Sequence, residues 1–134
     1  MKVIVDTSVW SLALRRDNND SPAPVQELRH LIHDHRVQMI GPIRQETLSG
    51  IRSESQFKKL RKHLESFPDL PILTKDYVTA AHFFNRCRSK GIQGSNTDFL
   101  ICAVAVRNKF SIYTTDKDFG LFSKYIQIVL HKAE

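Results

Sequence analysis

The chain has 134 residues, of which 41% are apolar and 25% charged, and its 20 Lys and Arg against 14 Asp and Glu give a formal net charge of +6. This composition suits one globular domain spanning residues 1–134, and no stretch approaches the roughly 20 apolar residues of a membrane span. Two cysteines form no disulfide framework and the first residues do not read as an export signal, so we expect a reducing, cytoplasmic setting.

Short apolar runs that predict strands alternate along the chain with apolar residues at helical spacing. In the first half of the chain we expect a strand at 2–5, helices at 8–15 and 24–35 around a turn-rich break at 17–24, a strand at 37–40, and helices at 41–50 and 54–65. In the second half we expect a strand at 71–73, helices at 75–89 and 97–108, and strands at 111–114 and 126–129 with a short helix between them. This alternation predicts a three-layer α/β/α fold, in which helices cover both faces of a central, mostly parallel sheet of four to five strands.

Acidic residues recur where predicted strands end or helices begin. Asp6 ends the first strand, Glu46 lies in the helix after the second, Asp98 opens the apolar helix 97–108, and Asp116 and Asp118 follow the strand 111–114. In an open parallel sheet the carboxyl ends of the strands meet in one crevice, so these side chains are expected to converge. Clustered carboxylates repel each other, and Mg²⁺ or Mn²⁺ relieves the repulsion because hard cations prefer oxygen ligands.

Asp6, Asp98 and Asp116 also have purely structural interpretations, and Glu46 alone would pass as a surface residue. Asp6 can cap the helix that follows it. Ser95 stands three residues before Asp98, which is the spacing of a capping box. A capping carboxylate still has a free oxygen, so capping and metal binding are compatible. Asp116 can be an ordinary turn residue, although two acids separated by one residue and next to Thr114 favour a cation site.

Basic residues form groups whose function the sequence leaves open. The net positive charge favours polyanions such as nucleic acids, but it also serves solubility alone. Lys58, Lys59, Arg61 and Lys62 share one predicted helix. Arg86, Arg88 and Lys90 precede the loop that leads to Asp98, and we expect them to form a cationic rim for a phosphodiester substrate. The alternative is a solvated charged face.

The motifs together resemble the PIN-domain ribonucleases, in particular the VapC-type toxins of bacterial toxin–antitoxin pairs. The matching segments are Val3–Ser8, Glu46 in its helix, Thr97–Ala103 and Thr114–Phe119. The resemblance covers essentially the whole chain. It implies that Asp6, Glu46, Asp98 and Asp116 are the acidic quartet of the active site, that Asp118 is an additional metal ligand, and that Thr7 and Thr114 are polar residues that support the acids. Cys102 departs from the alanine usual at its position, without consequence for the chemistry.

The same resemblance implies a PIN-like fold, a Mg²⁺- or Mn²⁺-dependent endoribonuclease that hydrolyses RNA phosphodiester bonds, a homodimer, and an inhibiting antitoxin protein. Two other functions are considered. A PIN-like module could bind nucleic acid or a partner without cutting it, although the complete acid set argues against that. A phosphoacceptor receiver domain needs a pair of acids after the first strand, where this chain has one, and an aspartate after the third strand, where Asp76 is the candidate.

Overall fold

The computed structural model describes residues 1–14 and 22–133. The described part contains a parallel sheet with the strand order β2–β1–β3, built from β1 (Val3–Val5), β2 (Val37–Gln38) and β3 (Ser111–Tyr113). Within the sheet, Val3 of β1 lies opposite Val37 on one side and Ser111 on the other. The carboxyl ends of all three strands therefore lie at one edge, which confirms an α/β fold with a parallel sheet.

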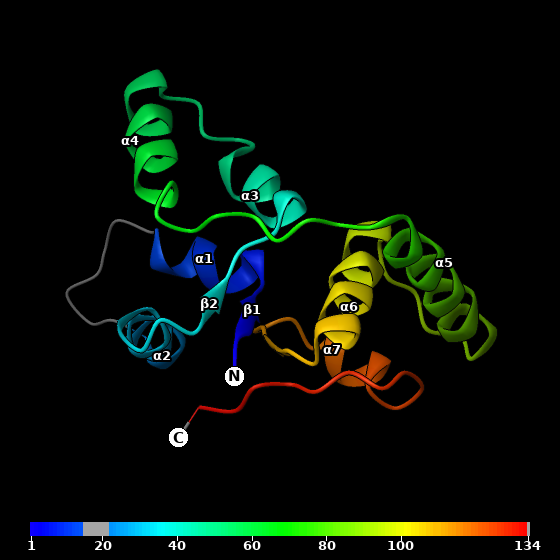
Figure 1. Cartoon of the computed structure of the whole chain (residues 1–134). Helices are drawn as coiled ribbons and strands as arrows, with labels where there is room; N and C mark the ends of the chain where they lie inside the picture. The colour runs from blue at the N-terminus through cyan, green and yellow to red at the C-terminus, as the bar shows by residue number, and fades with distance from the viewer. Residues whose placement is uncertain (15–21, 134) are drawn as a thin grey trace.

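Helices lie on both sides of the sheet, with α1 and α2 on one side and α5 and α6 on the other (Figure 1). The helices of the described part are α1 (Thr7–Ala13), α2 (Ala23–His33), α3 (Gly41–Leu48), α4 (Glu54–Leu64), α5 (Thr74–Ser89), α6 (Asn96–Asn108) and α7 (Asp118–Phe122). All correspond to predicted helices. The predicted end of the first helix at residue 15 and most of the turn-rich break at 17–24 lie outside the described residues.

The expected sheet of four to five strands is wrong, because two predicted strands do not form. At 71–73, Pro71 has no N–H to donate to a sheet, and the N–H of Leu73 donates to Asp76 Oδ2 at 2.8 Å, where it caps α5. The segment that reaches β2 lies slightly earlier, where Asp69 forms a single parallel bridge with Met39.

The segment 126–129 lies beside β3, but two of its N–H groups donate hydrogen bonds within local turns. The N–H of Ile126 donates to the carbonyl of Phe122, and that of Ile128 donates to the carbonyl of Ile126. In the described part, the segment's link to β3 is the N–H of Ile112 donating to the carbonyl of Val129 at 2.9 Å, within the isolated bridge between Ile112 and Leu130. Its alternating apolar residues therefore pack as an irregular cover on the sheet edge.

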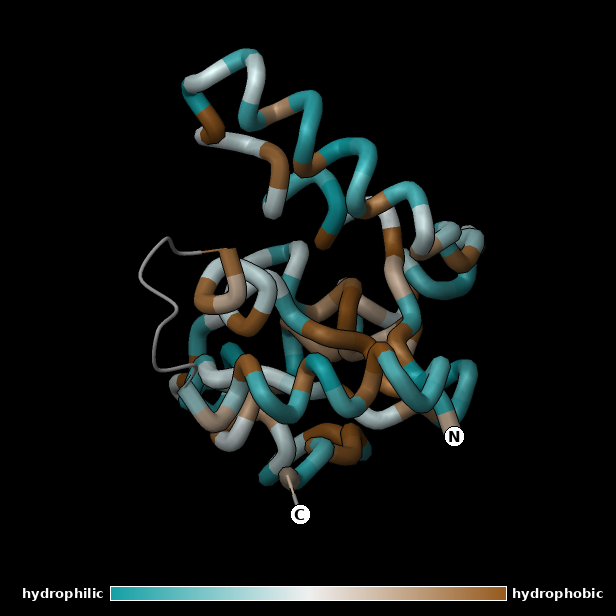
Figure 2. Tube along the Cα trace, turned by 90° about the vertical axis from the view of Figure 1, so that its left-hand side faces the viewer, coloured by the Kyte–Doolittle hydropathy of each residue, from teal (hydrophilic) through white to brown (hydrophobic). Residues whose placement is uncertain are grey.

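Among the helices of the described part, α6 has the most buried residues, and it packs against α5 and β3. Its buried residues are Phe99, Ile101, Cys102, Ala103, Val104 and Ala105. Hydrophobic segments gather in the middle of the trace in Figure 2, whereas α4, at the top of that view, is mainly hydrophilic. Within the described residues, no helix is long and apolar enough to cross a membrane.

Gly94 lets the loop before α6 pass close to two aromatic rings. A Cβ placed at this position would lie 2.5 Å from Phe122 Cζ and 2.9 Å from Phe99 Cε2. The loop ends in Ser95, the N-cap of α6. The contact between Gly94 and the two rings therefore fixes where α6 begins, and with it the position of Asp98.

We expect Gly94→Ala to lower the free energy of unfolding by about 1–3 kcal/mol, the usual cost of overpacking a core. Urea denaturation measures this difference. Gly120→Ala is the matched control, because no atom lies within 4 Å of a Cβ placed there. Equal stability of the two variants would contradict the prediction.

Candidate active site

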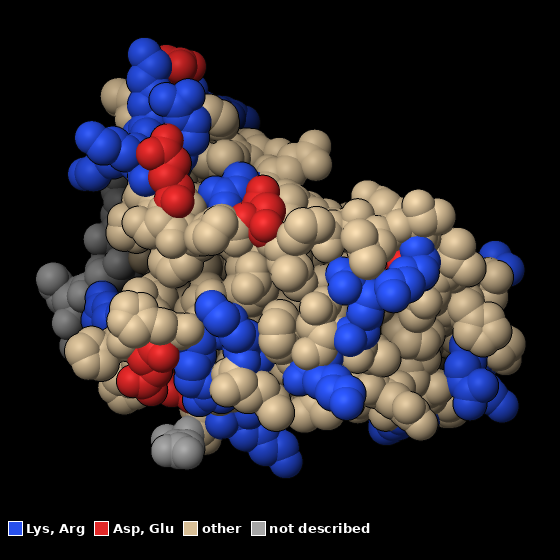
Figure 3. Space-filling view, in the orientation of Figure 1, with Lys and Arg blue, Asp and Glu red and all other residues tan. Residues whose placement is uncertain are grey.

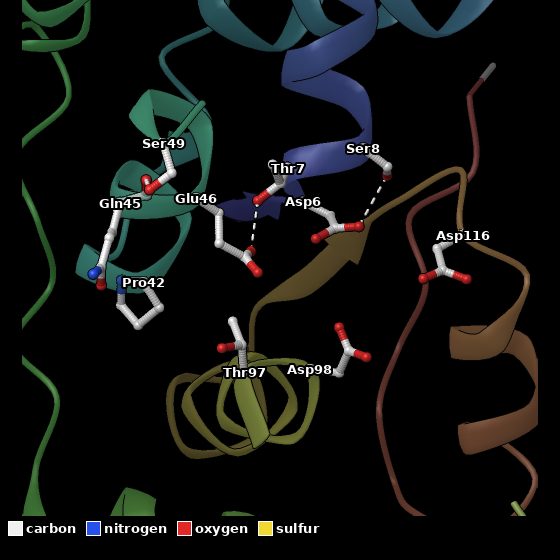
Figure 4. Close-up of a pocket in the computed structure, with 10 residues that line it drawn as sticks. All are labelled: Asp6, Thr7, Ser8, Pro42, Gln45, Glu46, Ser49, Thr97, Asp98 and Asp116. Carbon is white, nitrogen blue, oxygen red and sulfur yellow. Dashed lines mark hydrogen bonds between the residues drawn. The ribbon is translucent and has the colours of Figure 1, made fainter. Parts of the chain in front are cut away.

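A pocket of about 650 Å³ opens at the carboxyl edge of the sheet, between the beginnings of α1 and α6 and one face of α3 (Figure 4). Four of its lining residues are the predicted acids Asp6, Glu46, Asp98 and Asp116. The others are Thr7, Ser8, Pro42, Gln45, Ser49 and Thr97. The fold therefore brings together carboxylates from four distant parts of the sequence, as the convergence of parallel strand ends predicts.

Asp6 is held by two hydroxyl groups that bond to the same carboxylate oxygen. Its side chain is buried, with 6% exposed. Thr114 Oγ1 donates to Asp6 Oδ2 at 2.8 Å and Ser8 Oγ donates to it at 2.9 Å. Each hydroxyl also accepts a backbone N–H, from Asp116 at Thr114 and from Thr115 at Ser8. These N–H bonds direct the hydroxyl protons toward Asp6, which leaves its Oδ1 available to the pocket.

Glu46 reaches the pocket from α3 and is fixed from α1. Thr7 Oγ1 donates to Glu46 Oε1 at 2.9 Å, and Figure 4 shows the Glu46 carboxylate between the two helices. Glu46 is exposed, unlike Asp6. Because the hydroxyl of Thr7 occupies one oxygen, Oε2 remains free for a water molecule or a cation.

Asp98 both caps α6 and faces the pocket. Its Oδ2 accepts the N–H of Ser95 at 3.1 Å, while Ser95 Oγ accepts the N–H of Asp98 at 3.0 Å, so the predicted capping box is confirmed. Burial raises the pKa of Asp98 above its ordinary value of 3.8, and the negative charges of Asp6 and Asp116 raise it further, against the lowering effect of the bonds to Ser95. The charges of both other aspartates of the pocket therefore act on the Asp98 carboxyl.

Asp116 and Asp118 have different environments. Asp116 lines the pocket, and its Oδ1 accepts the N–H of Asp118 at 2.9 Å as α7 begins. Asp118 is exposed and its side chain does not line the pocket. In this structure Asp118 therefore contacts the pocket through its backbone N–H, which bonds to the Asp116 carboxylate.

The predicted basic rim lies on the last turn of α5, outside the pocket lining. Arg86 Nε donates to the carbonyl of Tyr125 at 2.6 Å, which ties α5 to the chain after α7. The guanidinium of Arg88 lies 5.5 Å from the centre of the Phe84 ring. Lys90 is the C-cap residue of α5. Arg86 is thus engaged within the protein, and the rim remains a prediction.

Helix α4 carries a second basic group on its exposed face. Lys and Arg side chains gather over α4 in Figure 3. They are Lys58, Lys59, Arg61 and Lys62, all of them exposed. None of the ion pairs in the described part of the chain includes them. Their charge is therefore available to a polyanion.

The residues of the pocket fit a divalent cation in donor type and in charge. All four acids offer oxygen atoms, which Mg²⁺ and Mn²⁺ prefer, and a cation would offset the repulsion that adds to the effect of burial on the pKa of Asp98. As the side chains stand, no group of three or more His, Cys, Asp or Glu among the described residues is close enough to hold a metal ion. Ligation by three of these acids therefore requires rotation of their side chains.

Ser8, Gln45, Pro42, Ser49 and Thr97 line the pocket but were not among the predicted site residues. Ser8 had a signal in the sequence, because it lies two residues after Asp6 at the start of a helix, where serine commonly bonds to nearby groups. The others depend on which face of α3 or α6 turns inward. Sequence periodicity alone leaves that open for a helix as polar as α3.

Comparison with known proteins gives a consistent result. A model of the PIN domain family matches residues 3–125. The chain is 28% identical over 126 residues to Ribonuclease VapC11 of Mycobacterium tuberculosis. The aligned region covers 91% of this chain and 92% of that protein.

Solved structures share the fold. VapBC2 from Rickettsia felis, determined bound to a DNA fragment from its promoter, has a TM-score of 0.77 at 16% identity and covers 100% of both chains. Mycobacterium tuberculosis VapC20, a sarcin-ricin loop cleaving toxin, has a TM-score of 0.66 at 17% identity and covers 95% of this chain and 98% of that one.

Proposed function

We propose that this chain, which belongs to the PIN-domain family, is a metal-dependent endoribonuclease and the toxin of a toxin–antitoxin pair. The observation that carries the proposal is the convergence of Asp6, Glu46, Asp98 and Asp116 on one pocket. The likeness to a VapC ribonuclease over 91% of the chain supports RNA as the substrate. The unpaired cations of α4 supply a surface for its phosphates.

The proposed roles follow from the contacts of each acid. Asp6, Asp98 and Asp116 would hold Mg²⁺ or Mn²⁺, with Asp6 offering the oxygen that its two hydroxyl partners leave free. Glu46, held by Thr7, would be a further ligand or would orient the attacking water. When bound, the metal would lower the pKa of water and offset negative charge on the attacked phosphate. Asp118 stays a prediction as an additional ligand, since its side chain does not line the pocket in this structure.

Expression in a bacterial host without any antitoxin tests the proposal. Induction of the wild-type chain should stop growth and create discrete new 5′ ends in cellular RNA, whereas Asp116→Asn should do neither. Normal growth with folded wild-type protein, and RNA that is bound but intact, would instead favour a PIN-like module that binds without cutting.

An antitoxin partner and a homodimer are also part of the proposal. The match to the toxin–antitoxin complex of Rickettsia felis spans the whole chain, which supports a similar partner here. Self-association is supported by exposed apolar side chains around the start of α5, where Leu73, Tyr77 and Val78 are 39%, 56% and 65% exposed. Sedimentation velocity of the purified chain tests the dimer, and a purely monomeric species at micromolar concentration would contradict it.

We expect Ser8→Ala to raise the Mn²⁺ concentration needed for half-maximal RNA cleavage by about 10- to 100-fold, the usual effect of removing a group that orients a metal ligand. The substitution removes one of the two hydroxyls on Asp6 Oδ2 and leaves the N–H of Thr115 without its acceptor. Metal titrations of the cleavage rate measure the effect. Ser8→Thr restores a hydroxyl and should recover the wild-type value, so failure of this rescue would count against a positioning role.

A further inference from the structure

The pocket has two chemically different halves (Figure 4). Asp6, Asp98 and Asp116 lie together on one side of the picture. Pro42 and Gln45 of α3, together with its C-cap residue Ser49, form the other side, with Glu46 between the two groups. The acidic half accounts for phosphodiester hydrolysis. The neutral half is not needed for that chemistry, so its residues call for another explanation.

Helix α3 presents a continuous face to the pocket. Its lining residues Pro42, Gln45 and Glu46 follow the spacing i, i+3 and i+4, which places them on one side of the helix, and the lining residue Ser49 is its extended C-cap residue. Glu46 is explained by the proposed reaction and is bonded to Thr7. Gln45 stands beside it, one position earlier, and is exposed. The same face that supplies a carboxylate to the reaction therefore also supplies a carboxamide.

The carboxamide of Gln45 has no partner in the described part of the chain. The backbone carbonyl of Gln45 accepts Ser49 Oγ at 2.7 Å and the N–H of Ser49 at 2.9 Å, and neither bond involves the carboxamide. A glutamine side chain offers two donor hydrogens and a carbonyl acceptor. All of them are available to a ligand that enters the pocket.

An RNA strand placed with one phosphate at the acidic half can place an adjacent nucleotide at the neutral half, because both halves line one pocket. Single-stranded RNA is read through unstacked bases that are hydrogen-bonded on their edges, and a glutamine can bond to a base with two bonds at once. The ring of Pro42 gives this half an apolar surface, and Ser49 keeps lone pairs free because its proton is directed to Gln45. No charge on these residues repels a neighbouring phosphate.

We propose that the neutral half of the pocket is a nucleobase subsite and that Gln45 selects the base next to the cleaved bond. The inference rests on the proposed ribonuclease function and extends it to the choice of cleavage site. It assigns Gln45 to substrate selection and leaves the bond-breaking step to the four acids. Replacement of Gln45 should therefore alter which sequences are bound and cut.

Binding of short RNAs tests the subsite separately from cleavage. Fluorescence anisotropy gives the dissociation constants of Asp98→Asn protein, in Mg²⁺, for fluorescent octamers of adenylate, cytidylate and uridylate. The same constants are measured after adding Gln45→Met, which keeps the length of the side chain and removes its hydrogen bonds. Gln56→Met is the matched control, because Gln56 is also an exposed helical glutamine but lies on α4 outside the pocket.

We expect the Asp98→Asn protein to prefer one octamer by about 5-fold or more, since a bidentate side-chain contact to a base discriminates by about 1–3 kcal/mol. Gln45→Met should bring the ratio of dissociation constants between the octamers close to one, and Gln56→Met should leave that ratio unchanged. A ratio that survives Gln45→Met, an initial ratio of one, or no RNA binding at all would overturn the subsite.

Cleavage-site mapping with wild-type protein on a randomised RNA is run in parallel, so that the two proposals can fail separately. Base-selective binding that depends on Gln45, combined with no cleavage by the wild type, would remove the nuclease function and retain the subsite. Metal-dependent cleavage with the same base preference in wild type and Gln45→Met would retain the nuclease and remove the subsite.

Discussion

Asp98→Asn is expected to slow RNA cleavage by at least about a hundredfold. A catalytic metal supplies several kcal/mol of transition-state stabilisation, and each 1.36 kcal/mol corresponds to a factor of ten in rate. The neutral carboxamide is a weaker ligand and no longer offsets the charge of a cation. Initial cleavage rates of a labelled RNA in Mn²⁺, measured for both proteins, give the ratio. A variant with near-native rate would remove Asp98 from the proposed site.

The same substitution is expected to stabilise the metal-free protein. Burial is the largest cause of the raised pKa of Asp98, and the negative charges of Asp6 and Asp116 raise that pKa further. A carboxyl with a higher pKa in the folded than in the unfolded state supports folding when protonated. That contribution is complete below the ordinary pKa of 3.8 and is lost as the pH rises through the raised value. At neutral pH the charge of Asp98 therefore opposes folding, and asparagine removes this cost while its carbonyl can still accept the N–H of Ser95.

Thermal unfolding in EDTA at pH 7 measures this second effect. Asp98→Asn should have the higher midpoint, and the difference from the wild type should shrink as the pH is lowered toward 4. A lower midpoint for the variant would show that the cap depends on the carboxylate charge and would contradict the prediction. Loss of activity combined with gain of stability distinguishes a functional carboxylate from a structural one.

Asp76→Ala is expected to lower the free energy of unfolding by about 3 kcal/mol. Asp76 is 1% exposed and accepts two hydrogen bonds from Arg107, at 2.6 Å to Oδ1 and 2.9 Å to Oδ2. It also accepts the N–H of Leu73 at the start of α5. Removing one partner of a buried ion pair costs about 3–5 kcal/mol, and the low end applies because the side chain of Arg107 is 24% exposed.

Urea denaturation of Asp76→Ala and Asp69→Ala provides the comparison. Asp69 pairs with Arg44 at 3.0 Å, but its side chain is 44% exposed, so its removal should cost no more than about 1 kcal/mol. Similar losses in the two variants would contradict the role given to the buried pair.

The contribution of Asp76 should also depend on pH in the opposite direction to that of Asp98. Burial by itself would raise the pKa of Asp76, but the hydrogen bonds from Arg107 and Leu73 and the positive charge of Arg107 outweigh it, so the pKa lies below 3.8. A group with a depressed pKa in the folded state stabilises it above the ordinary pKa. The stability advantage of the wild type over Asp76→Ala should therefore be complete above about pH 4 and decline as the pH falls below it.

The sequence predicted those features that depend on local pattern and strand order. The start of α6 follows from Ser95 and Asp98, whose reciprocal bonds need only three residues of separation. The convergence of Asp6 and Asp116 follows from the parallel pairing of β1 with β3. These predictions needed no knowledge of side-chain packing.

Features set by tertiary contacts could not be predicted in the same way. The apolar residues near Leu73 look like a strand, but the bond to Asp76 makes them the beginning of a helix. Asp76 itself was considered only as a phosphoacceptor, whereas it is buried against Arg107, 31 residues later in the chain. The inward face of α3, with Gln45 beside Glu46, depends on how that helix is rotated against α1.

The most direct test of the carboxylate pocket is cleavage of total cellular RNA by purified protein in Mn²⁺, in EDTA, and after Mn²⁺ is restored, with Asp6→Asn prepared in parallel. We predict discrete fragments that disappear in EDTA and return with the metal, and intact RNA with the variant. Equal cleavage in EDTA, or equal cleavage by Asp6→Asn, would contradict a metal-dependent nuclease built from these acids.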